Sequence, residues 1–406
     1  MMEKVLDPPK LQVATAALPR NPMQMAWWGV VVVFLVHGLV VSTWVSRIAG
    51  VKSALGLSDG ALGLALLGAA IGSVAAIPAS GWAVGRFGSR LVVQFTAAGF
   101  AVSLLLLAFS PTLVALFAAL VGYGVMAGAN DVAINANAVG VEKQLGRPTM
   151  SRFHAMFSLG GIIGSAAGAW IASAGVAPRI HLGIASIIIL VFIVATRRLL
   201  CDTGGDRPNT GQFSFKKPPP ALLALSMIGF CIFLSEGAIA DWTAVYLRQV
   251  LKSGEGLAAA GYAAFSAAMT VFRFTGDTIT LRLGRAWTVR GGALVAGCGL
   301  ALVVTATSPA VALAGFAAAG AGFSSIIPVV FAAGGRVASV SEAAGVATVS
   351  GIGYLGFLVG PPAIGFLSEA TSLRGGLFLL VILCAASALL VTLVERGSRD
   401  GENPLA

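Results

Sequence analysis

The sequence predicts an all-α membrane protein whose twelve transmembrane helices form two six-helix bundles with pseudo-two-fold symmetry. Of its 406 residues, 57% are hydrophobic and only 10% are charged, whereas charged residues make up about 25% of a soluble domain. The apolar residues stand in continuous runs of about 20, the length that crosses a bilayer as a helix. Such runs exclude an outer-membrane barrel, whose strands alternate apolar and polar residues. The second half of the chain also repeats features of the first.

Twelve apolar runs are long enough to span a membrane, and short polar segments separate them. In chain order the expected spans are 26–48, 61–84, 90–110, 112–138, 153–174, 179–199, 221–248, 257–281, 288–307, 309–333, 343–368 and 372–395. The third and fourth spans are separated only by Ser110-Pro111, and the ninth and tenth only by Ser308-Pro309. A Ser-Pro dipeptide is typical of a tight turn, which we expect at both places.

A polar segment in the middle of the chain divides the spans into two sets of six. This segment, 200–220, contains three consecutive prolines and is interpreted as a cytoplasmic linker between domains. We therefore expect six-helix bundles over 26–199 and 221–395. The ends, 1–25 and 396–406, are expected to be cytoplasmic tails.

The net charge is +10, and the basic residues responsible for it are distributed unevenly among the loops. If the N-terminus is inside, 19 Lys and Arg residues fall in cytoplasmic segments and six in external ones. Cytoplasmic loops carry the excess of basic residues, so both termini are expected in the cytoplasm of a bacterium, with the protein in its inner membrane. The basic composition is thus a topology signal, and we expect no nucleic-acid partner.

Matching features recur at a nearly constant offset between the two halves. Trp44 recurs as Trp242 and Ser110-Pro111 as Ser308-Pro309, each 198 residues later, whereas Gly160 recurs as Gly356, 196 residues later. Because each half has six spans, the repeats have the same orientation in the membrane. That arrangement predicts two bundles related by an axis along the membrane normal, with a solute site between them at mid-depth.

The loop after the second span resembles that of a known family. Gly81-Trp82-Ala83-Val84-Gly85-Arg86-Phe87-Gly88-Ser89-Arg90 is similar to the loop signature of the major facilitator superfamily, with Gly85 where that family usually has Asp. The stretches 131–137, 151–161 and 353–356 resemble its bacterial MosC/YbjJ-like subgroup, which is distantly similar to fucose permeases. The resemblance implies twelve helices, alternating access and proton coupling.

Three titratable residues inside spans are candidates for proton coupling. A carboxylate at the bilayer centre costs about 2.5–3.5 kcal/mol on an insertion scale, so Asp131 and Glu236 are rarely expected there without a role. His37 titrates nearest neutral pH and is the third candidate. For each residue the alternative is structural: Asp131 pins neighbouring helices by hydrogen bonds, Glu236 pairs with a basic residue, or His37 is a buried hydrogen-bond donor.

Five polar or aromatic residues are candidates for binding the solute: Trp44, Asn135, Asp241, Trp242 and Tyr354. Asn135 follows Asp131 by four residues and shares its helix face. Asp241 follows Glu236 by five residues, so both face one cavity only if the helix breaks, for example at Gly237. The two tryptophans are interpreted either as stacking platforms for a sugar-like ring or as interfacial anchors, and Tyr354 as a cavity hydroxyl or a packed aromatic residue.

Basic residues near the loops, with one intrahelical pair, are candidates for gating. Arg86 and Arg90 belong to the loop after the second span, and Arg282 to its repeat. Arg273 and Asp277 are four residues apart in the eighth span and can form an ion pair near its cytoplasmic end. We expect this pair to act as a gate or structural latch.

These features predict a secondary active transporter that takes up a small polar solute, such as a sugar, polyol or amino-polyol, together with protons. One alternative is a proton-driven exporter of amphipathic or drug-like compounds, and another is a non-transporting membrane receptor. The sequence has no nucleophile–base pair, no cluster with metal-ligand spacing and no phosphate-binding loop, so we expect neither an enzyme nor a metal or cofactor. The expected partners are the solute, protons and the lipid bilayer, and the expected state is a monomer.

Overall fold

The computed structural model describes residues 22–146, 149–200, 218–337, 342–396 and 404–405. Within these residues, twelve apolar helical segments are long enough to cross a membrane, which confirms the twelve expected spans. The predicted linker and the two predicted tails lie largely outside the described residues. The first helix begins at Pro22, four residues before the expected start of the first span.

The first six spans build one bundle, called the N bundle here. Its helices are α1 (Pro22–Val45), α2 (Ile48–Leu55), α3 (Asp59–Phe87), α4 (Ser89–Ala108), α5 (Leu113–Leu145), α6 (Met150–Ser173) and α7 (Pro178–Thr196), followed by the 3₁₀ turn η1 (Arg197–Leu199). The last six spans build the C bundle. Its helices are α8 (Pro220–Gln249), α9 (Glu255–Leu283), α10 (Arg285–Thr305), α11 (Pro309–Phe323), α12 (Ile326–Gly334), α13 (Glu342–Ala370) and α14 (Leu373–Arg396).

Two of the spans are broken helices. The first span bends at Ser46-Arg47, between α1 and α2, and the tenth bends at Ser324-Ser325, between α11 and α12. At both places a serine hydroxyl donates to a carbonyl three residues back, Ser46 to Thr43 at 2.9 Å and Ser324 to Ala321 at 2.7 Å. Such bonds compete with the helix ladder. Neither break contains proline or glycine, so neither could be predicted from a helix-breaking residue.

The duplication is visible in the turns that follow α3 and α9. Gly88 and Gly284, which are 196 residues apart, both have a positive φ, of 82° and 79°. Each donates its backbone N–H to the carbonyl four residues earlier, to Val84 and to Thr280, at 2.9 Å. Glycine tolerates this conformation without steric cost, so the same residue ends the second span and its repeat in the same way.

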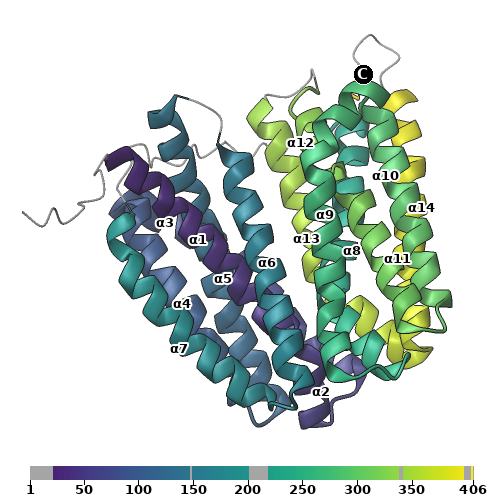
Figure 1. Ribbon diagram of the computed structural model, residues 1–406. Helices are drawn as coiled ribbons and strands as arrows, with labels where there is room; N and C mark the ends of the chain where they lie inside the picture. Colours follow the sequence, from purple (N-terminus) through teal and green to yellow (C-terminus); the bar gives the residue numbers. More distant parts are fainter. Residues whose placement is uncertain (1–21, 147–148, 201–217, 338–341, 397–403, 406) are drawn as a thin grey trace, which may run out of the picture.

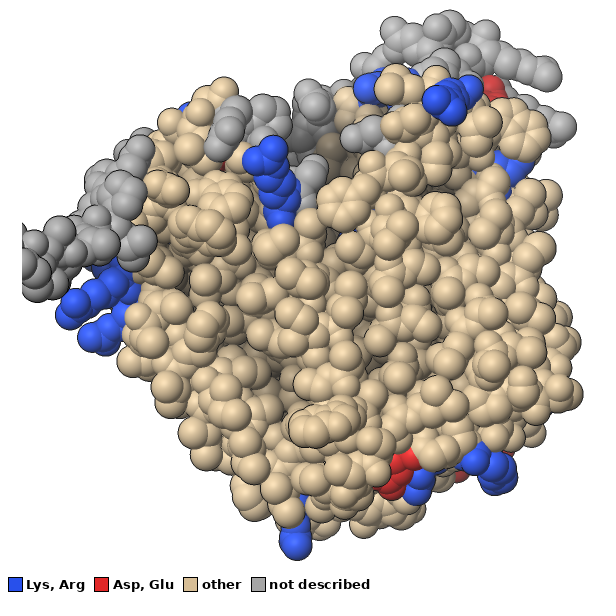
Figure 2. Space-filling view, in the orientation of Figure 1, with Lys and Arg blue, Asp and Glu red and all other residues tan. Residues whose placement is uncertain are grey.

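The two bundles stand side by side and approach each other at one end only (Figure 1). They converge at the end that carries α2, called the closed end, and diverge at the end that carries the C-terminus, called the open end. Contacts between the bundles are made mainly by α6 with α9 and by α3 with α13. Lys, Arg, Asp and Glu gather at the two ends of the face in Figure 2, with a band of uncharged residues between them. This band fits the hydrocarbon layer of a bilayer.

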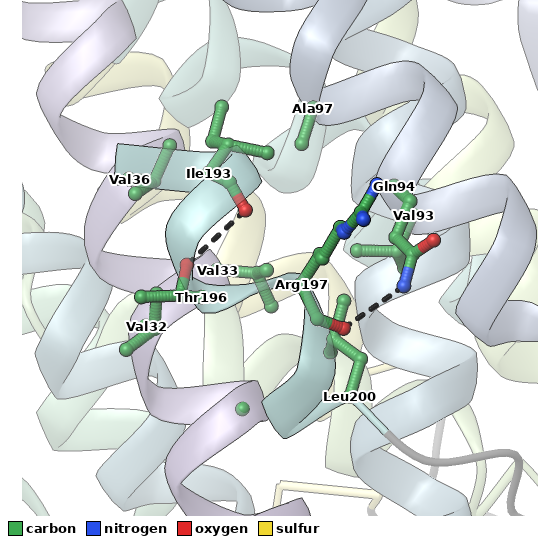
Figure 3. A pocket seen from close by; sticks show the side chains of 11 residues that line it. Val32, Val33, Val36, Val93, Gln94, Ala97, Ile193, Thr196, Arg197 and Leu200 are labelled. Carbon is green, nitrogen blue, oxygen red and sulfur yellow. Dashed lines mark hydrogen bonds between the residues drawn. The ribbon is translucent and has the colours of Figure 1, made fainter. Parts of the chain in front are cut away.

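A small crevice in the N bundle shows how its outer helices are held together. It lies between α1, α4 and α7, has a volume of about 10 Å³, and is lined mostly by valine, alanine and isoleucine (Figure 3). The Gln94 side-chain amide on α4 donates to the carbonyl of Arg197 in η1 at 3.0 Å. This bond satisfies a carbonyl at the end of the sixth span. The crevice is therefore a packing defect and not a solute site.

The contact between α3 and α5 depends on glycine. A Cβ atom at Gly124 would lie 1.9 Å from the carbonyl oxygen of Ala69, whereas nothing lies within 4 Å of one at Gly122, two residues away on the same helix. Close backbone approach of this kind drives helix association in lipid. We expect Gly124→Val to lower the free energy of unfolding by about 1–3 kcal/mol, the usual cost of overpacking.

The measurement is thermal unfolding of the purified protein in detergent, with Gly122→Val as the matched control. The control is expected to shift the melting temperature much less, because its side chain enters open space. Equal shifts in the two variants would show that the close contact between α3 and α5 does not limit stability.

Candidate functional site

A large cavity lies between the two bundles and opens toward the open end. It has a volume of about 440 Å³, within the range of small-molecule sites. His154 and Ser158 of α6 line it from the N bundle, and Thr270 and Arg273 of α9 face them from the C bundle, beside Ser324 at the α11–α12 break. Figure 2 shows the molecule hollowed between the bundles at this end. The break between α11 and α12 thus contributes directly to the cavity wall.

A narrow crevice continues from this cavity toward the middle of the molecule. Ser158 and Arg273 line both spaces. The crevice holds about 30 Å³, enough for one water molecule. Its walls are Gly38, Val41, Ser42, Phe157 and Gly161 from the N bundle and Glu236, Tyr262, Ser266 and Met269 from the C bundle. Glu236 therefore lines a crevice that shares two wall residues with the cavity at the open end.

Arg273 lines both the cavity and the crevice. Its side chain is exposed on the cavity wall and acts electrostatically on Glu236 of α8 and on His154 of α6. The sequence predicted Arg273 as half of a gating pair with Asp277. The side chain of Asp277 lies outside the described residues, so the pair stays a prediction. The observed surroundings instead place Arg273 between the cavity and Glu236.

Asp131 lies in the middle of α5, with Asn135 one turn later. The Asn135 amide donates to the Asp131 carboxylate at 3.2 Å and to its backbone carbonyl at 2.9 Å. The Asp131 side chain is accessible to solvent and yet surrounded by protein, as expected of a residue that faces an internal space and not lipid. Tyr354 of the C bundle acts electrostatically on Asp131 and on Glu236. The two carboxylates, one in each bundle, are therefore both within electrostatic range of Tyr354.

Tyr354 belongs to an aromatic cluster on the C-bundle side. Its ring stacks on Phe233 with centroids 5.1 Å apart and on Phe357 at 6.3 Å, and 37% of its surface remains exposed. Phe233 also contacts Phe331, at 6.1 Å, which lines the large cavity. Tyr354 is thus packed against aromatic rings and partly exposed, and contact of its hydroxyl with the solute stays a prediction.

His37 lies in the core of the N bundle. It is 7% exposed and packs against Phe100 and Phe157, with ring centroids 5.0 and 5.6 Å away. Its Nδ1 atom is 2.9 Å from the side-chain amide nitrogen of Asn130, and the Asn130 carbonyl oxygen accepts from the hydroxyl of Thr96 at 2.9 Å. In this network Nδ1 of His37 accepts a hydrogen bond from Asn130. The network connects α1, α4 and α5 beside Asp131. A role for His37 in proton movement stays a prediction.

The sequence did not single out Asn130, although it precedes Asp131 and is equally unusual inside a span. A polar residue in a membrane helix is itself a signal that a partner is near. The second partner, Thr96, gave no such signal because threonine is common in spans. This part of the site could therefore be predicted only by knowing which helices are neighbours.

The two tryptophans are more deeply buried than a stacking platform requires. Trp44 is 3% exposed and packs near Tyr123 at 6.5 Å, and Trp242 is fully buried. Within the described residues, the Trp242 indole N–H has no hydrogen-bond partner. Neither residue lines the cavity or the crevice in this conformation. Solute contact by either one stays a prediction for another conformation.

Asp241 is half-buried on α8, and α8 continues as a regular helix through Gly237. The possible break at Gly237 is therefore absent from this conformation. Asp241 acts electrostatically on Tyr123 of the N bundle and Tyr262 of the C bundle. It lies between the bundles, but it does not share the crevice with Glu236.

The remaining predicted gating residues lie at helix ends, away from the cavity lining. Arg86 and Arg282 are exposed in the last turns of α3 and α9, and Arg90 is half-buried in the first turn of α4. Among the described residues, no group of three or more His, Cys, Asp or Glu side chains is arranged to hold a metal ion.

Comparisons with known proteins agree with this architecture. The family model described as Major Facilitator Superfamily matches residues 26–351. An uncharacterized MFS-type transporter of Yersinia pestis is 34% identical over 362 residues, covering 88% of this chain and 94% of the relative. The membrane protein MosC of Rhizobium meliloti is 32% identical, covering 87% of each chain. The crystal structure of a mutant of the nucleoside transporter NupG superposes with a TM-score of 0.75 at 13% identity, covering 92% of this chain and 98% of that one.

Proposed function

The chain belongs to the Major Facilitator Superfamily and is a multi-pass membrane transporter of that type, and from this premise we propose that it takes up a small polar solute together with protons. The proposed solute class is a sugar, a polyol or an amino-polyol. Transport proceeds by alternating access, in which the bundles rock to expose the space between them to each side in turn.

The proposal is supported mainly by Glu236, a carboxylate that lines a crevice between the bundles, next to the cavity at the open end. Asp131 of the N bundle lies within electrostatic range of Tyr354, as Glu236 does. The cavity and its crevice also offer hydroxyl groups of Ser158, Ser266 and Thr270. Hydroxyl and carboxylate groups on facing walls can bind a polyhydroxylated solute by several hydrogen bonds. Such a solute bridges the bundles, so its binding favours their closure.

The two carboxylates supply the means of coupling. An ionised carboxylate is costly to enclose in a low-dielectric interior, and protonation removes that cost. In the proposed cycle, a proton bound at Glu236 or Asp131 lets the bundles close over the solute. Return of the empty carrier requires those protons to be released, and the nearby Arg273 then offsets the charge of ionised Glu236.

The proposed orientation places the open end in the cytoplasm of a bacterium, with the protein in the inner membrane as a monomer. The distribution of Lys and Arg between the two sets of loops supports this orientation. In this orientation the structure corresponds to an inward-facing state. No nucleic-acid partner is proposed.

A second candidate function is proton-driven export of amphipathic compounds. The observation that favours it is the apolar share of the cavity wall, where Phe274, Ile327, Val329 and Phe331 lie close to the polar groups. An apolar ring system could bind against these side chains while a polar end reaches Arg273 or Glu236.

The test is transport by the purified protein in proteoliposomes with an imposed proton gradient. We expect labelled polyols or sugars to accumulate when the outside is acidic and to be displaced by related unlabelled solutes. If lipophilic cations displace the labelled solute and no polar solute competes, the uptake proposal is rejected in favour of export.

A further inference from the structure

A charged cluster lies at the closed end, where the N bundle meets the C bundle. Arg47 stands at the α1–α2 break and is only 2% exposed, which is unusual for arginine. One of its terminal nitrogens donates to the carbonyl of Val176, in the α6–α7 loop. Within the described residues its Nε has no hydrogen-bond partner. The guanidinium is thus held inside the protein with part of its hydrogen-bonding capacity unused.

The compensating carboxylate belongs to the other bundle. Glu255, in the first turn of α9, acts electrostatically on Arg47. It also pairs with Arg248, in the last turn of α8, at 3.0 Å. All three residues line a crevice of about 10 Å³ whose remaining walls come from both bundles. Glu255 therefore lies between an arginine of its own bundle and an arginine of the N bundle.

The neighbourhood of Arg47 contains one more titratable group. His181, near the start of α7, is 6% exposed and acts electrostatically on Arg47, and within the described residues its Nδ1 has no hydrogen-bond partner. It supplies no negative charge. Glu255 is therefore the carboxylate that offsets the buried guanidinium, which stays charged because arginine is not deprotonated in proteins.

The helices of the two bundles pack tightly beside the cluster. A Cβ atom at Gly256 would lie 2.7 Å from the Cβ of Ser173 and 2.9 Å from the carbonyl oxygen of Ala169, both on α6. The start of α9 is thus in backbone-level contact with the end of α6. Arg47 is enclosed at this contact, whereas the Glu255 side chain keeps 39% of its surface exposed. The carboxylate therefore reaches the buried guanidinium from the solvent-facing side of the crevice. When the bundles separate at this end, water solvates Arg47 and Glu255 individually.

We propose that Glu255 is a latch residue, whose attraction for the buried Arg47 holds the closed end shut while the cavity is open at the other end. The proposal rests on alternating access, the proposed function, because the latch must release in each cycle. Without the carboxylate, Arg47 has no counter-charge while it is buried at the shut closed end. When that end opens, water solvates Arg47, so only the shut conformation is destabilised. The closed end then opens more often.

The pair Glu255→Gln and Arg248→Gln separates the latch from the ion pair within the C bundle. Arg248→Gln breaks the bond of Arg248 to Glu255 but leaves the attraction between Glu255 and Arg47. Both variants are made in a background in which the four cysteines are replaced by serine or alanine and Ala259 by cysteine. Ala259 lines the crevice and is 2% exposed, so its labelling by a membrane-impermeant maleimide reports opening of the closed end.

We expect Glu255→Gln to raise the labelling rate about tenfold, within the usual range of conformational coupling, and Arg248→Gln to change it less than about twofold. The double variant Arg47→Gln with Glu255→Gln is expected to label more slowly than Glu255→Gln alone, because no buried charge then lacks its partner. Equal labelling of Glu255→Gln and Arg248→Gln would overturn the latch.

Labelling needs no transport, so the two proposals fail separately. If Glu255→Gln raises the labelling rate in a protein that transports no solute, the proposed function is contradicted and the latch proposal is upheld. Unchanged labelling in a protein that transports would contradict the latch alone.

Discussion

Replacing Asp131 with asparagine, or Glu236 with glutamine, is expected to abolish proton-driven accumulation of the solute and to leave exchange of solute across the membrane largely intact. Each substitution keeps the shape of the side chain and removes its ability to bind and release a proton. Exchange needs no return of the empty carrier, so it does not require deprotonation. Accumulation requires deprotonation in every cycle. We expect the ratio of internal to external solute to fall by about 5–150-fold, which corresponds to a coupling free energy of about 1–3 kcal/mol.

The measurements are accumulation driven by an imposed proton gradient and solute exchange at equal pH on both sides. Glu395→Gln is a suitable control, because Glu395 pairs with Arg290 at 2.8 Å between α14 and α10 and has no place in the cavity lining. This control is expected to accumulate solute normally. Accumulation that survives in both the Asp131 and Glu236 variants would disprove the assignment of proton coupling to these two residues.

The spans were predictable from the sequence because membrane insertion imposes a length and a composition on every helix. The turns after the second and eighth spans were predictable too, because only glycine readily adopts the positive φ found at Gly88 and Gly284. The breaks at Ser46-Arg47 and Ser324-Ser325 were not. They depend on serine hydroxyl bonds and packing against neighbouring helices, and the hydropathy of both segments stays high across the break.

The candidate site was predictable where it rests on single unusual residues. Asp131 and Glu236 stand out because a carboxylate inside a span is costly. Glu236 lines the crevice between the bundles, and both carboxylates are within electrostatic range of Tyr354. What could not be predicted is pairing across helices. Arg47 lies at the end of the expected first span, where a basic side chain normally faces water, and is buried in the structure. Trp242 was a candidate for solute binding and is fully buried. Burial of these side chains is decided by which helices meet, and one sequence does not contain that information.

Replacing Gly365 with leucine is expected to stop both accumulation and exchange, in contrast to the carboxylate variants. Gly365 on α13 meets Gly63 on α3 at the closed end. A Cβ atom at Gly365 would lie 2.8 Å from the carbonyl oxygen of Asp59 and 3.0 Å from the Cα of Gly63. These helices belong to different bundles, so the added side chain separates the bundles without disturbing the core of either. Every transport cycle, including exchange, requires this end to close.

The expected loss of transport rate is about tenfold or more. Overpacking of this kind costs about 1–3 kcal/mol, and about 1.4 kcal/mol changes an equilibrium tenfold. Gly351→Leu is the matched control on the same helix, because nothing lies within 4 Å of a Cβ atom there. Thermal unfolding in detergent is expected to be nearly equal in the two variants, since the bundles themselves stay intact. A Gly365→Leu protein that exchanges solute at the parent rate would show that α3 and α13 need not meet at this point, and the closed end would then depend on the contact of α6 with α9 and on Glu255.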